Sequence, residues 1–460
     1  MNQWEVRTVK NAKQLNVIML HLGEAMYPQD YLADVIQKVQ EAVAGMDCNL
    51  LGCYKVMSEK DAGMCRKSIE GMPVDLFILN FVSWHITPYV MHILKNNTRI
   101  PLLIWGIGGT TDETGKLHSP AAAAGITGFL PVAKEFGFTV KVILQKPDSV
   151  PAAEEAAHFI HLAACAKKIR ESRIGLIGYA DMGLYTCAYD KTALFKKLGI
   201  DIEDYSGYEI MNRMEQCTRE QAAEIVADIR EHLKFENQIS DKVLEKAARL
   251  YYAMKSKADG SELDAISIKC VNGTTDHLGL NPCLAQSLLA GKDLSVICEC
   301  DAYGLVTSIL LAAVTGHAAA FMEHYEVFEK EVLVGVCGFI PEEFTENGVK
   351  IRAANLGEIN TGISNVSKVR TGEVTFARFY QTGGAFKLFL SKGIAKAAPK
   401  WTELGWEEPT PDFPAVLLEP SIPMEEYLDK VPGQHIIMVY GDWMEDVKTV
   451  CRLLDIEVVQ

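Results

Sequence analysis

The sequence predicts an α/β protein with two Rossmann-like parallel-sheet domains and a mainly antiparallel β domain at the C-terminus. Short apolar runs typical of buried strands alternate with helix candidates over the first two thirds of the chain, which favours parallel sheets. In the last third, the runs alternate apolar and polar residues between glycine-containing turns, which indicates antiparallel strands. A length of 460 residues exceeds what one core usually supports, so several domains are expected.

The first domain is predicted to cover residues 1–170. Its apolar runs are typical of buried strands, and an amphipathic segment and an alanine-rich segment are typical of helices. In chain order we expect a strand at 14–22, a helix at 31–44, strands at 74–81, 101–105 and 139–144, and a helix at 151–169.

The central domain is predicted to cover residues 171–318. The glycine turn at 178–183 completes neither a dinucleotide-binding fingerprint nor a P-loop, so we interpret it as a tight turn. Strands are expected at 173–178, 199–203 and 264–270 and in the run that ends at Glu299, with helical regions at 191–198 and 218–258.

The third domain is predicted to cover residues 319–460. Its alternating pattern favours an antiparallel sheet or a small barrel. Strands are expected in the run that ends at Glu323 and at 331–337, 364–370, 373–379, 385–390, 436–440 and 456–459, with a helix at 445–454.

The composition, 48% hydrophobic and 23% charged, is that of an ordinary globular enzyme. A net charge of −15 argues against a nucleic-acid partner, because phosphates need a basic surface. No stretch is apolar enough to span a membrane, and the segment Met1–Arg7 lacks a signal-peptide core, so we expect a cytoplasmic protein. The cysteines form no CxxC pair and are expected to be buried reduced thiols.

Two glutamates, Glu299 and Glu323, are the strongest candidates for chemistry. Each ends a short apolar run, and between them lies the apolar helix candidate Ala302–Thr315, which stops at Gly316. We expect a βαβ unit, in which the two strands are parallel and both carboxylates reach the carboxyl edge of one sheet. Two carboxylates that converge there can hold a divalent metal ion and move a proton.

His435 is the candidate third ligand. It lies in the turn Pro432–Ile436, which leads into a strand. Two carboxylates and one imidazole favour Mn²⁺ or another hard divalent cation and leave positions for substrate oxygens. The alternative is structural: a histidine at a strand start commonly packs in the core, and a carboxylate that ends an apolar run needs a partner of some kind.

Several segments resemble the L-fucose/L-arabinose isomerase superfamily. Cys298–Ser308 is similar to the family segment whose glutamate binds metal, and Phe321–Tyr325 is close to the Phe-Met-Glu-Asp-Tyr segment of arabinose isomerases. Gln434 and His435, followed by Val439–Asp442 and a helix, resemble the C-terminal histidine segment of fucose isomerases. Weaker similarity through the N-terminal two thirds concerns mainly the fold.

The resemblance implies an Mn²⁺-dependent aldose–ketose isomerase, an intramolecular oxidoreductase, with Glu299, Glu323 and His435 as metal ligands. The metal would stabilise an enediolate as a Lewis acid, while the two glutamates move the proton between C1 and C2. Arabinose isomerases carry a further metal-binding histidine after the second acid. The corresponding stretch Val334–Gly338 has none, and His324 would point the other way, so we expect three protein ligands.

Lys269, Asp301, Trp84 and Gln434 are candidates for contacts with the substrate. Lys269 ends a strand that is expected on the same edge, and it can meet an anionic group or pair with an acid such as Asp301. Asp301 can orient a ligand or cap the following helix, with the cap favoured. By resemblance, Trp84 can reach the site of a neighbouring subunit, with core or interface packing as the alternative, and Gln434 takes the place of a polar amide.

The expected substrate is a small-molecule sugar: a pentose, a 6-deoxyhexose or a modified hexose such as a sulfonated sugar. By resemblance, the chain forms a homotrimer or homohexamer with active sites between subunits. Two other functions stay open, a non-catalytic sugar-binding protein and a metal-dependent epimerase or lyase on the same scaffold. Product analysis separates them, because an isomerase yields a ketose of identical mass.

Overall fold

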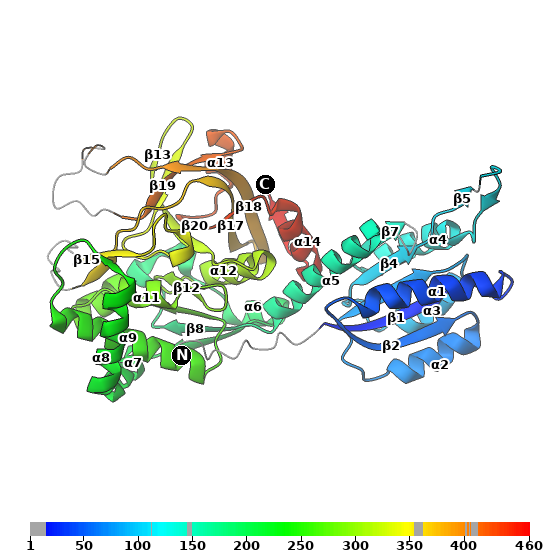
Figure 1. Ribbon diagram of the computed structural model, residues 1–460, viewed down its shortest axis with the longest axis horizontal. Helices are drawn as coiled ribbons and strands as arrows, with labels where there is room; N and C mark the ends of the chain where they lie inside the picture. Colours follow the sequence, from blue (N-terminus) through cyan, green and yellow to red (C-terminus); the bar gives the residue numbers. More distant parts are fainter. Residues whose placement is uncertain are drawn as a thin grey trace. The chain divides into compact units, whose positions relative to one another are not determined.

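The computed structural model describes residues 15–111, 113–144, 150–353, 362–400, 403, 405 and 413–460 (Figure 1). The segment Met1–Arg7, on which the cytoplasmic expectation depends, lies outside these ranges. The chain divides into two compact units, Met1–Lys168 and Ile169–Gln460, with the division inside helix α5 (Val150–Arg170).

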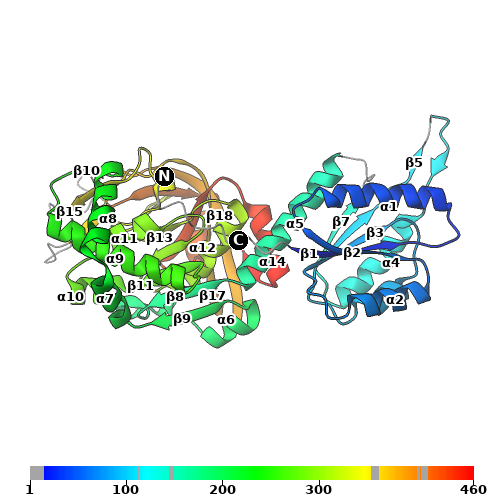
Figure 2. The same cartoon turned by 60° about the horizontal axis from the view of Figure 1, so that its bottom comes forward.

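The first unit is built on a five-stranded parallel sheet with the order β2-β1-β3-β4-β7. Helices α2, α3 and α4 contribute to one apolar cluster with the sheet, and α1 contributes to a second one on the opposite side (Figure 2). The element bounds are β1 (Asn16–Leu22), α1 (Gln29–Ala44), β2 (Asn49–Val56), α2 (Glu59–Ile69), β3 (Leu76–Phe81), α3 (Thr87–Leu94), β4 (Leu102–Gly106), β5 (Thr110–Thr111), β6 (Leu117–His118), α4 (Ala122–Glu135) and β7 (Val140–Leu144).

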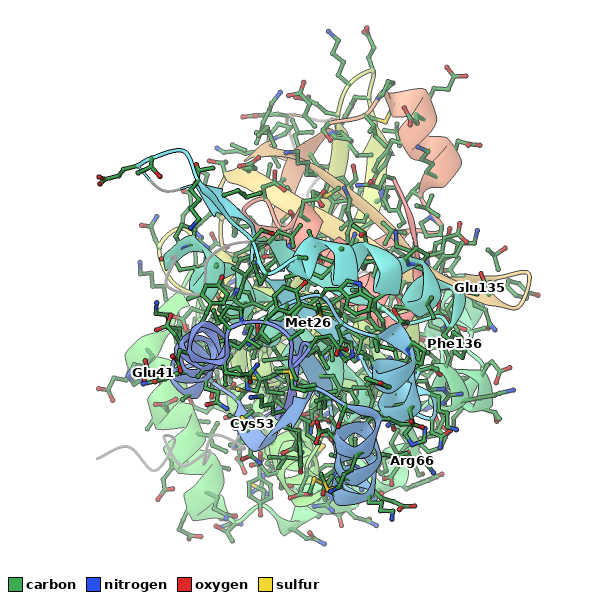
Figure 3. All side chains as sticks on the ribbon, turned by 90° about the vertical axis from the view of Figure 1, so that its right-hand side faces the viewer. Met26, Glu41, Cys53, Arg66, Glu135 and Phe136 are labelled. Carbon is green, nitrogen blue, oxygen red and sulfur yellow. The ribbon has the colours of Figure 1, made fainter. Side chains whose placement is uncertain are left out.

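The strand β2 is not among the predicted elements. It is the edge of the sheet and is only partly buried, so it lacks the continuous apolar run of a central strand. Position 52 within the strand requires a glycine, because a Cβ there would lie 2.8 Å from the ring of Tyr54. Figure 3 faces this unit and shows Cys53 on β2 and Met26 in the loop after β1.

The second unit contains a four-stranded parallel sheet with the order β12-β11-β8-β9. Three of its strands are almost wholly buried, as expected for parallel strands covered on both faces. The bounds are β8 (Arg173–Ile177), α6 (Lys191–Leu198), β9 (Asp201–Tyr205), α7 (Gly207–Gln216), α8 (Arg219–His232), α9 (Asp241–Gly260), β11 (Ala265–Ile268), α10 (Asp276–Leu278), α11 (Cys283–Leu289), β12 (Ser295–Cys298) and α12 (Ala302–Thr315).

The C-terminal part of this unit is an antiparallel barrel. Its strands follow the order β17-β20-β13-β14-β19-β18, and β18 pairs again with β17, which closes the sheet and removes its edges. The fold class predicted from the sequence is confirmed. The bounds are β13 (Ala320–Val327), β14 (Val332–Gly335), β17 (Gly372–Thr382), β18 (Ala385–Ala397), β19 (Ala415–Pro420), α13 (Met424–Lys430), β20 (His435–Tyr440), α14 (Met444–Leu454) and β21 (Glu457–Val459).

A separate three-stranded sheet joins β10 (Lys234–Phe235), β15 (Lys350–Ala353) and β16 (Ile363–Asn365). The predicted strand at 364–370 is therefore wrong in extent, since β16 ends at Asn365. The side chain of Asn365 accepts the Ser367 N–H (2.9 Å), and Ser367 Oγ accepts the Lys350 N–H (2.8 Å), so polar side chains turn the backbone away from an extended strand.

The predicted βαβ unit that links the two glutamates is wrong. β12 is the edge strand of the parallel sheet, whereas β13 pairs antiparallel with β14 and β20 in the barrel. α12 is buried at every position and contacts β11 and β12 on one side and β17 and β20 on another. A helix that is apolar all round needs apolar partners on several sides, so α12 separates two sheets instead of covering one.

Within the described residues, no helix is both long and apolar enough to cross a membrane. The cysteines are all free, as the sequence predicts, but the predicted burial fails for Cys53, which is exposed, and is only partial for Cys48 and Cys337. Because the parallel sheet ends at Cys298 and the barrel begins at Ala320, we retain the division of the second unit at residue 318 as a proposal.

Candidate metal centre

A strained turn at the end of β12 places Glu299. Glu299 and Cys300 have φ angles of +66° and +53°, in the left-handed region that costs a residue with a Cβ about 1–2 kcal/mol. The Cys300 N–H donates to Ser267 Oγ (2.9 Å), and the Asp181 N–H donates to the Glu299 carbonyl (3.1 Å). Ser267 on β11 and Asp181 in the segment after β8 therefore hold Glu299 in a conformation that it would not adopt alone.

Glu323 and His435 are opposite each other in the barrel. β13 and β20 run antiparallel with these two residues in register, so their side chains leave the same face of the sheet. Nε2 of His435 lies 3.2 Å from Oε2 of Glu299. The histidine thus connects the barrel strand to the turn that ends the parallel sheet.

One ligand atom from each of Glu299, Glu323 and His435 lies within 4.8 Å of the others. Glu299 and His435 are 2% and 1% exposed. In the part of the chain that the structure describes, Oε2 of Glu299, Oε1 of Glu323 and Nε2 of His435 are buried without a hydrogen-bond partner; the 3.2 Å approach is close but lacks hydrogen-bond geometry. Because a buried unsatisfied polar atom costs about 1–3 kcal/mol, this donor set fits a divalent cation.

The charges of the cluster support the same interpretation. Burial and the neighbouring Glu299 carboxylate raise the pKa of Glu323 to about 7. Burial opposes the protonation of His435, but its contacts with Asp301, Cys187 and Glu299 raise its pKa well above the ordinary value. Protons therefore accumulate on these side chains when they stand alone, and a bound cation would supply that positive charge instead.

A buried ion pair supports His435 from its other ring nitrogen. Nδ1 of His435 lies 2.9 Å from Oδ2 of Asp301, and the guanidinium of Arg378 on β17 pairs with the same carboxylate. Asp301 also accepts the Gly304 N–H (3.0 Å) as the N-cap of α12. Burial works against ionisation of Asp301, but the charges of Arg378 and His435 hold its pKa well below the usual range.

Asp301 combines the two roles that the sequence left open, since it caps α12 and contacts the histidine. Its carboxylate is fully buried and engaged at both oxygens, which favours an orienting role over the predicted contact with substrate. Arg378 is not among the predicted site residues. A signal for it exists, because an arginine inside the apolar run Val374–Phe379 must find an acid if that strand is buried.

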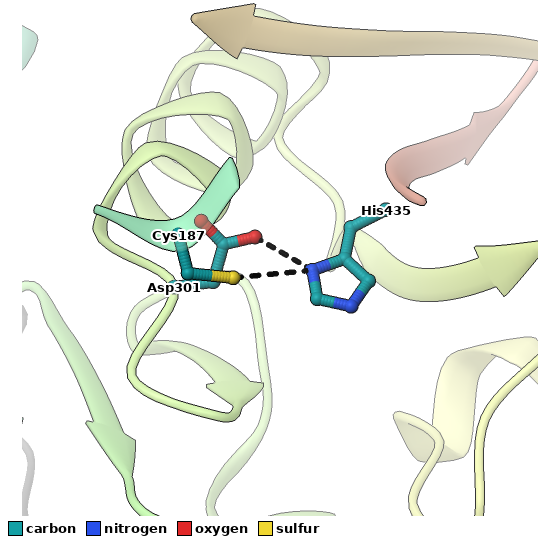
Figure 4. Close-up of side chains that lie close together, drawn as sticks. All are labelled: Cys187, Asp301 and His435. Carbon is teal, nitrogen blue, oxygen red and sulfur yellow. Dashed lines mark hydrogen bonds and ion pairs between the residues drawn. The ribbon is translucent and has the colours of Figure 1, made fainter. Parts of the chain in front are cut away.

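A second group of candidate ligands shares His435 and consists of Cys187, Asp301 and His435 (Figure 4). Sγ of Cys187 lies 3.8 Å from Nδ1 of His435. Burial raises the pKa of the Cys187 thiol, which disfavours the thiolate that a metal needs. Arg378 already neutralises Asp301 and would repel a metal on this side. The pair of glutamates is therefore the better partner of His435 in a metal site.

Lys269 lies at the same edge of the parallel sheet as Glu299. Ile268 and Cys298 are paired at the ends of β11 and β12, so Lys269 and Glu299 are the first residues after two adjacent strands. Nζ of Lys269 lies 3.6 Å from the centroid of the Tyr179 ring. Asp301, the acid considered as its partner, is paired with Arg378 instead.

Gln434 and His324 are the chain neighbours of two candidate ligands, since Gln434 precedes His435 and His324 follows Glu323. Oε1 of Gln434 accepts the Thr186 hydroxyl (2.8 Å), and the Gln434 carbonyl accepts the His324 N–H (2.9 Å). Nδ1 of His324 also lies 2.7 Å from that carbonyl, and its Nε2 contacts the hydroxyl of Tyr427. His324 is thus engaged outside the glutamate pair, while Gln434 is anchored next to His435.

Trp84 belongs to the first unit, where it follows β3. The residue is 38% exposed, and its backbone N–H donates to the Pro120 carbonyl (2.9 Å). A substrate contact by Trp84 from a neighbouring subunit stays a prediction.

Comparisons with known proteins agree with this geometry. Residues 327–460 match the model of the L-fucose isomerase, C-terminal domain, family. The chain is 21% identical over 401 residues to the sulfoquinovose isomerase of Priestia aryabhattai, which covers 85% of this chain and 86% of that protein. It is 18% identical over 454 residues to the sulfoquinovose isomerase of Alkalicoccus urumqiensis, covering 97% of this chain and 99% of that protein.

Taken with the fold, these relatives show that the protein is an enzyme of the sugar isomerase class. More specifically, the match of its C-terminal domain and the nearly full-length relatives are consistent with the L-fucose isomerase-like superfamily.

Proposed function

We propose that this chain is a metal-dependent aldose–ketose isomerase, which moves a proton between C1 and C2 of a sugar through an enediolate. The observation that carries the proposal is the convergence of Glu299, Glu323 and His435, whose facing atoms are buried and lack hydrogen-bond partners among the described residues. Such a set is costly unless it binds a cation, and the relatives are isomerases by name.

The proposed cofactor is Mn²⁺ or another divalent cation, held by Glu299, Glu323 and His435. When bound, it would supply Lewis-acid stabilisation of negative charge on the sugar oxygens O1 and O2. Two carboxylates and one neutral imidazole suit a hard divalent cation and, as only three protein ligands, leave room for a substrate.

The two glutamates would carry the protons. Conversion of an aldose to a ketose removes one proton from C2 and one from O2, and it adds one proton to C1 and one to O1. Glu299 and Glu323 come from different sheets and converge on one point. One can therefore serve the carbon proton while the other serves the hydroxyl proton.

A sulfonated hexose is the substrate that we favour among the three predicted sugars. The two relatives are sulfoquinovose isomerases by name, and a sulfonate needs a cationic partner. Lys269 is a suitable partner, because it ends the strand next to Glu299 and lies over the Tyr179 ring. Gln434 and Trp84 are proposed to contact sugar hydroxyls and the sugar ring.

Replacing Lys269 by methionine is expected to raise KM for a sulfonated hexose about 10-fold or more, because a charge-assisted hydrogen bond contributes about 1.5–3 kcal/mol. The kcat should change less, since Lys269 does not belong to the proposed metal site. The matched control is Lys242→Met, which removes an exposed lysine at the start of α9. An unchanged KM in Lys269→Met would rule out this lysine as the sulfonate partner.

The reaction is tested by incubating the Mn²⁺-loaded protein with aldoses, including a sulfonated hexose, in D₂O and in H₂O. We expect a ketose of identical mass in H₂O and one carbon-bound deuterium at C1 in D₂O, because an enediolate mechanism exchanges the transferred proton with solvent. A ketose without deuterium would indicate a hydride shift instead of an enediolate mechanism. Fragments of the sugar would indicate a lyase, and an epimer of the aldose would indicate an epimerase. Binding without turnover would indicate a sugar-binding protein.

The assembly and location are also proposals. Active sites between subunits of a homotrimer or homohexamer, and a cytoplasmic location, follow from the family resemblance and from the sequence. Mass photometry of the purified chain separates a trimer or hexamer from a monomer.

A further inference from the structure

Arg378 is a buried positive charge in the second unit. It lies on a barrel strand, is 1% exposed, and pairs with Asp301, which is 0% exposed. Ion pairs taken out of water are costly and rarely improve stability over apolar residues of similar size, so a buried pair invites the question of what it holds in place.

The contacts of Asp301 answer that question. Its Oδ1 accepts the Gly304 N–H (3.0 Å) and Nη2 of Arg378 (3.0 Å), while its Oδ2 contacts Nη1 of Arg378 and Nδ1 of His435. The carboxylate is therefore fixed on several sides, and as an acceptor it requires the N–H of the histidine to be on Nδ1. In the neutral imidazole that a metal binds, Nε2 then carries no hydrogen and faces Glu299.

Arg378 also fixes the segment of Thr186 and Cys187, which lies next to Nδ1 of His435. Its Nη2 donates to the Thr186 carbonyl (2.9 Å), and the Thr186 hydroxyl donates to Gln434, which precedes His435. One guanidinium thus connects β17, the turn after β12, the segment of Thr186 and the start of β20.

We infer that Arg378 is a positioning residue, which holds the Asp301 carboxylate so that His435 presents Nε2 as a metal ligand toward Glu299 and Glu323. The inference rests on the proposed metal site. Carboxylates that orient metal-binding histidines typically change metal affinity about 10–100-fold when they are removed. Here the orienting carboxylate itself depends on an arginine from a different sheet.

The test compares Mn²⁺ binding, measured by isothermal titration calorimetry without substrate, in wild type, Arg378→Met, Arg378→Lys and Arg370→Met. We expect Kd to rise about 10–100-fold in Arg378→Met, less in Arg378→Lys, and not at all in Arg370→Met. The last variant is a matched control, because Arg370 precedes the same strand but lies over the Tyr440 ring. Circular dichroism and Tm identify variants that fail to fold.

If Arg378→Met does not fold, the double variant Asp301→Asn/Arg378→Met is used in its place, because it removes both charges of the pair. An asparagine amide can donate to Nδ1 and move the histidine N–H to Nε2, so weak Mn²⁺ binding by a folded double variant is expected. Wild-type Kd in either folded variant would overturn the inference and leave the proposed isomerase intact. Conversely, a raised Kd in Arg378→Met together with a wild type that converts no sugar would support the positioning role of Arg378 and overturn the proposed reaction.

Discussion

Replacing Glu299 by glutamine is expected to lower kcat by about 10³-fold or more on any sugar that the wild type converts. Glutamine has the size of glutamate, so the strained turn at the end of β12 can be kept. The substitution removes one negative charge from the proposed metal site and one of the two groups that can move a proton, and loss of general acid–base catalysis alone costs about 10²–10⁴-fold.

The matched control is Glu326→Gln, which changes an exposed glutamate on β13, the strand that carries Glu323. This variant should retain wild-type kcat and KM. Measurement of initial rates with saturating Mn²⁺ separates a catalytic loss from a weaker metal affinity. If Glu299→Gln retains more than about a tenth of the wild-type kcat, which lies well outside the range for removal of a general base, the proposed mechanism is wrong.

Removal of divalent cations with a chelator is expected to abolish activity and lower Tm, and Mn²⁺ should restore both. A cation present at 100 times its Kd stabilises the folded protein by about 2.7 kcal/mol. For a unit of this size that free energy corresponds to a rise in Tm of about 5 °C. The physical reason is that the cation gives partners to three buried ligand atoms that otherwise have none among the described residues.

The variants Cys187→Ala and Glu323→Gln decide which side of His435 binds the cation. Cys187→Ala should keep the Mn²⁺-dependent rise in Tm, because Cys187 belongs only to the ligand group on the Nδ1 side. Glu323→Gln should lose it, and so should His435→Asn, because His435 belongs to both ligand groups. If Cys187→Ala loses the rise while Glu323→Gln keeps it, the cation binds with Cys187 and Asp301, and the assignment made here is reversed.

The convergence of the site residues could be predicted, but the reason for it could not. The sequence places Glu299 and Glu323 at the ends of apolar runs, and the resemblance adds His435; the structure brings all three together. The predicted parallel pairing is wrong, because a strand pattern states that a segment is extended and buried but not which sheet it joins. β13 pairs in the barrel with the strand that carries His435.

The supporting residues were harder to predict because their partners are distant in the sequence. Arg378 is 77 positions from Asp301, and neither residue alone indicates the other. Asp301 follows a strand and precedes a helix, so its role as a helix cap was predictable from local pattern. Its contact with His435 was only one of the options, since it depends on the barrel packing against the parallel sheet.

The sequence by itself determined the α/β class, the positions of most strands and helices, and the three side chains proposed to bind the metal, because hydrophobic periodicity and local motifs are properties of short segments. Only the tertiary structure decided that the glutamates belong to different sheets, that α12 lies between those sheets, and that Arg378 and Asp301 support His435. These features depend on contacts between distant segments, which form only when the barrel closes and buries its apolar surface against the parallel sheet and α12.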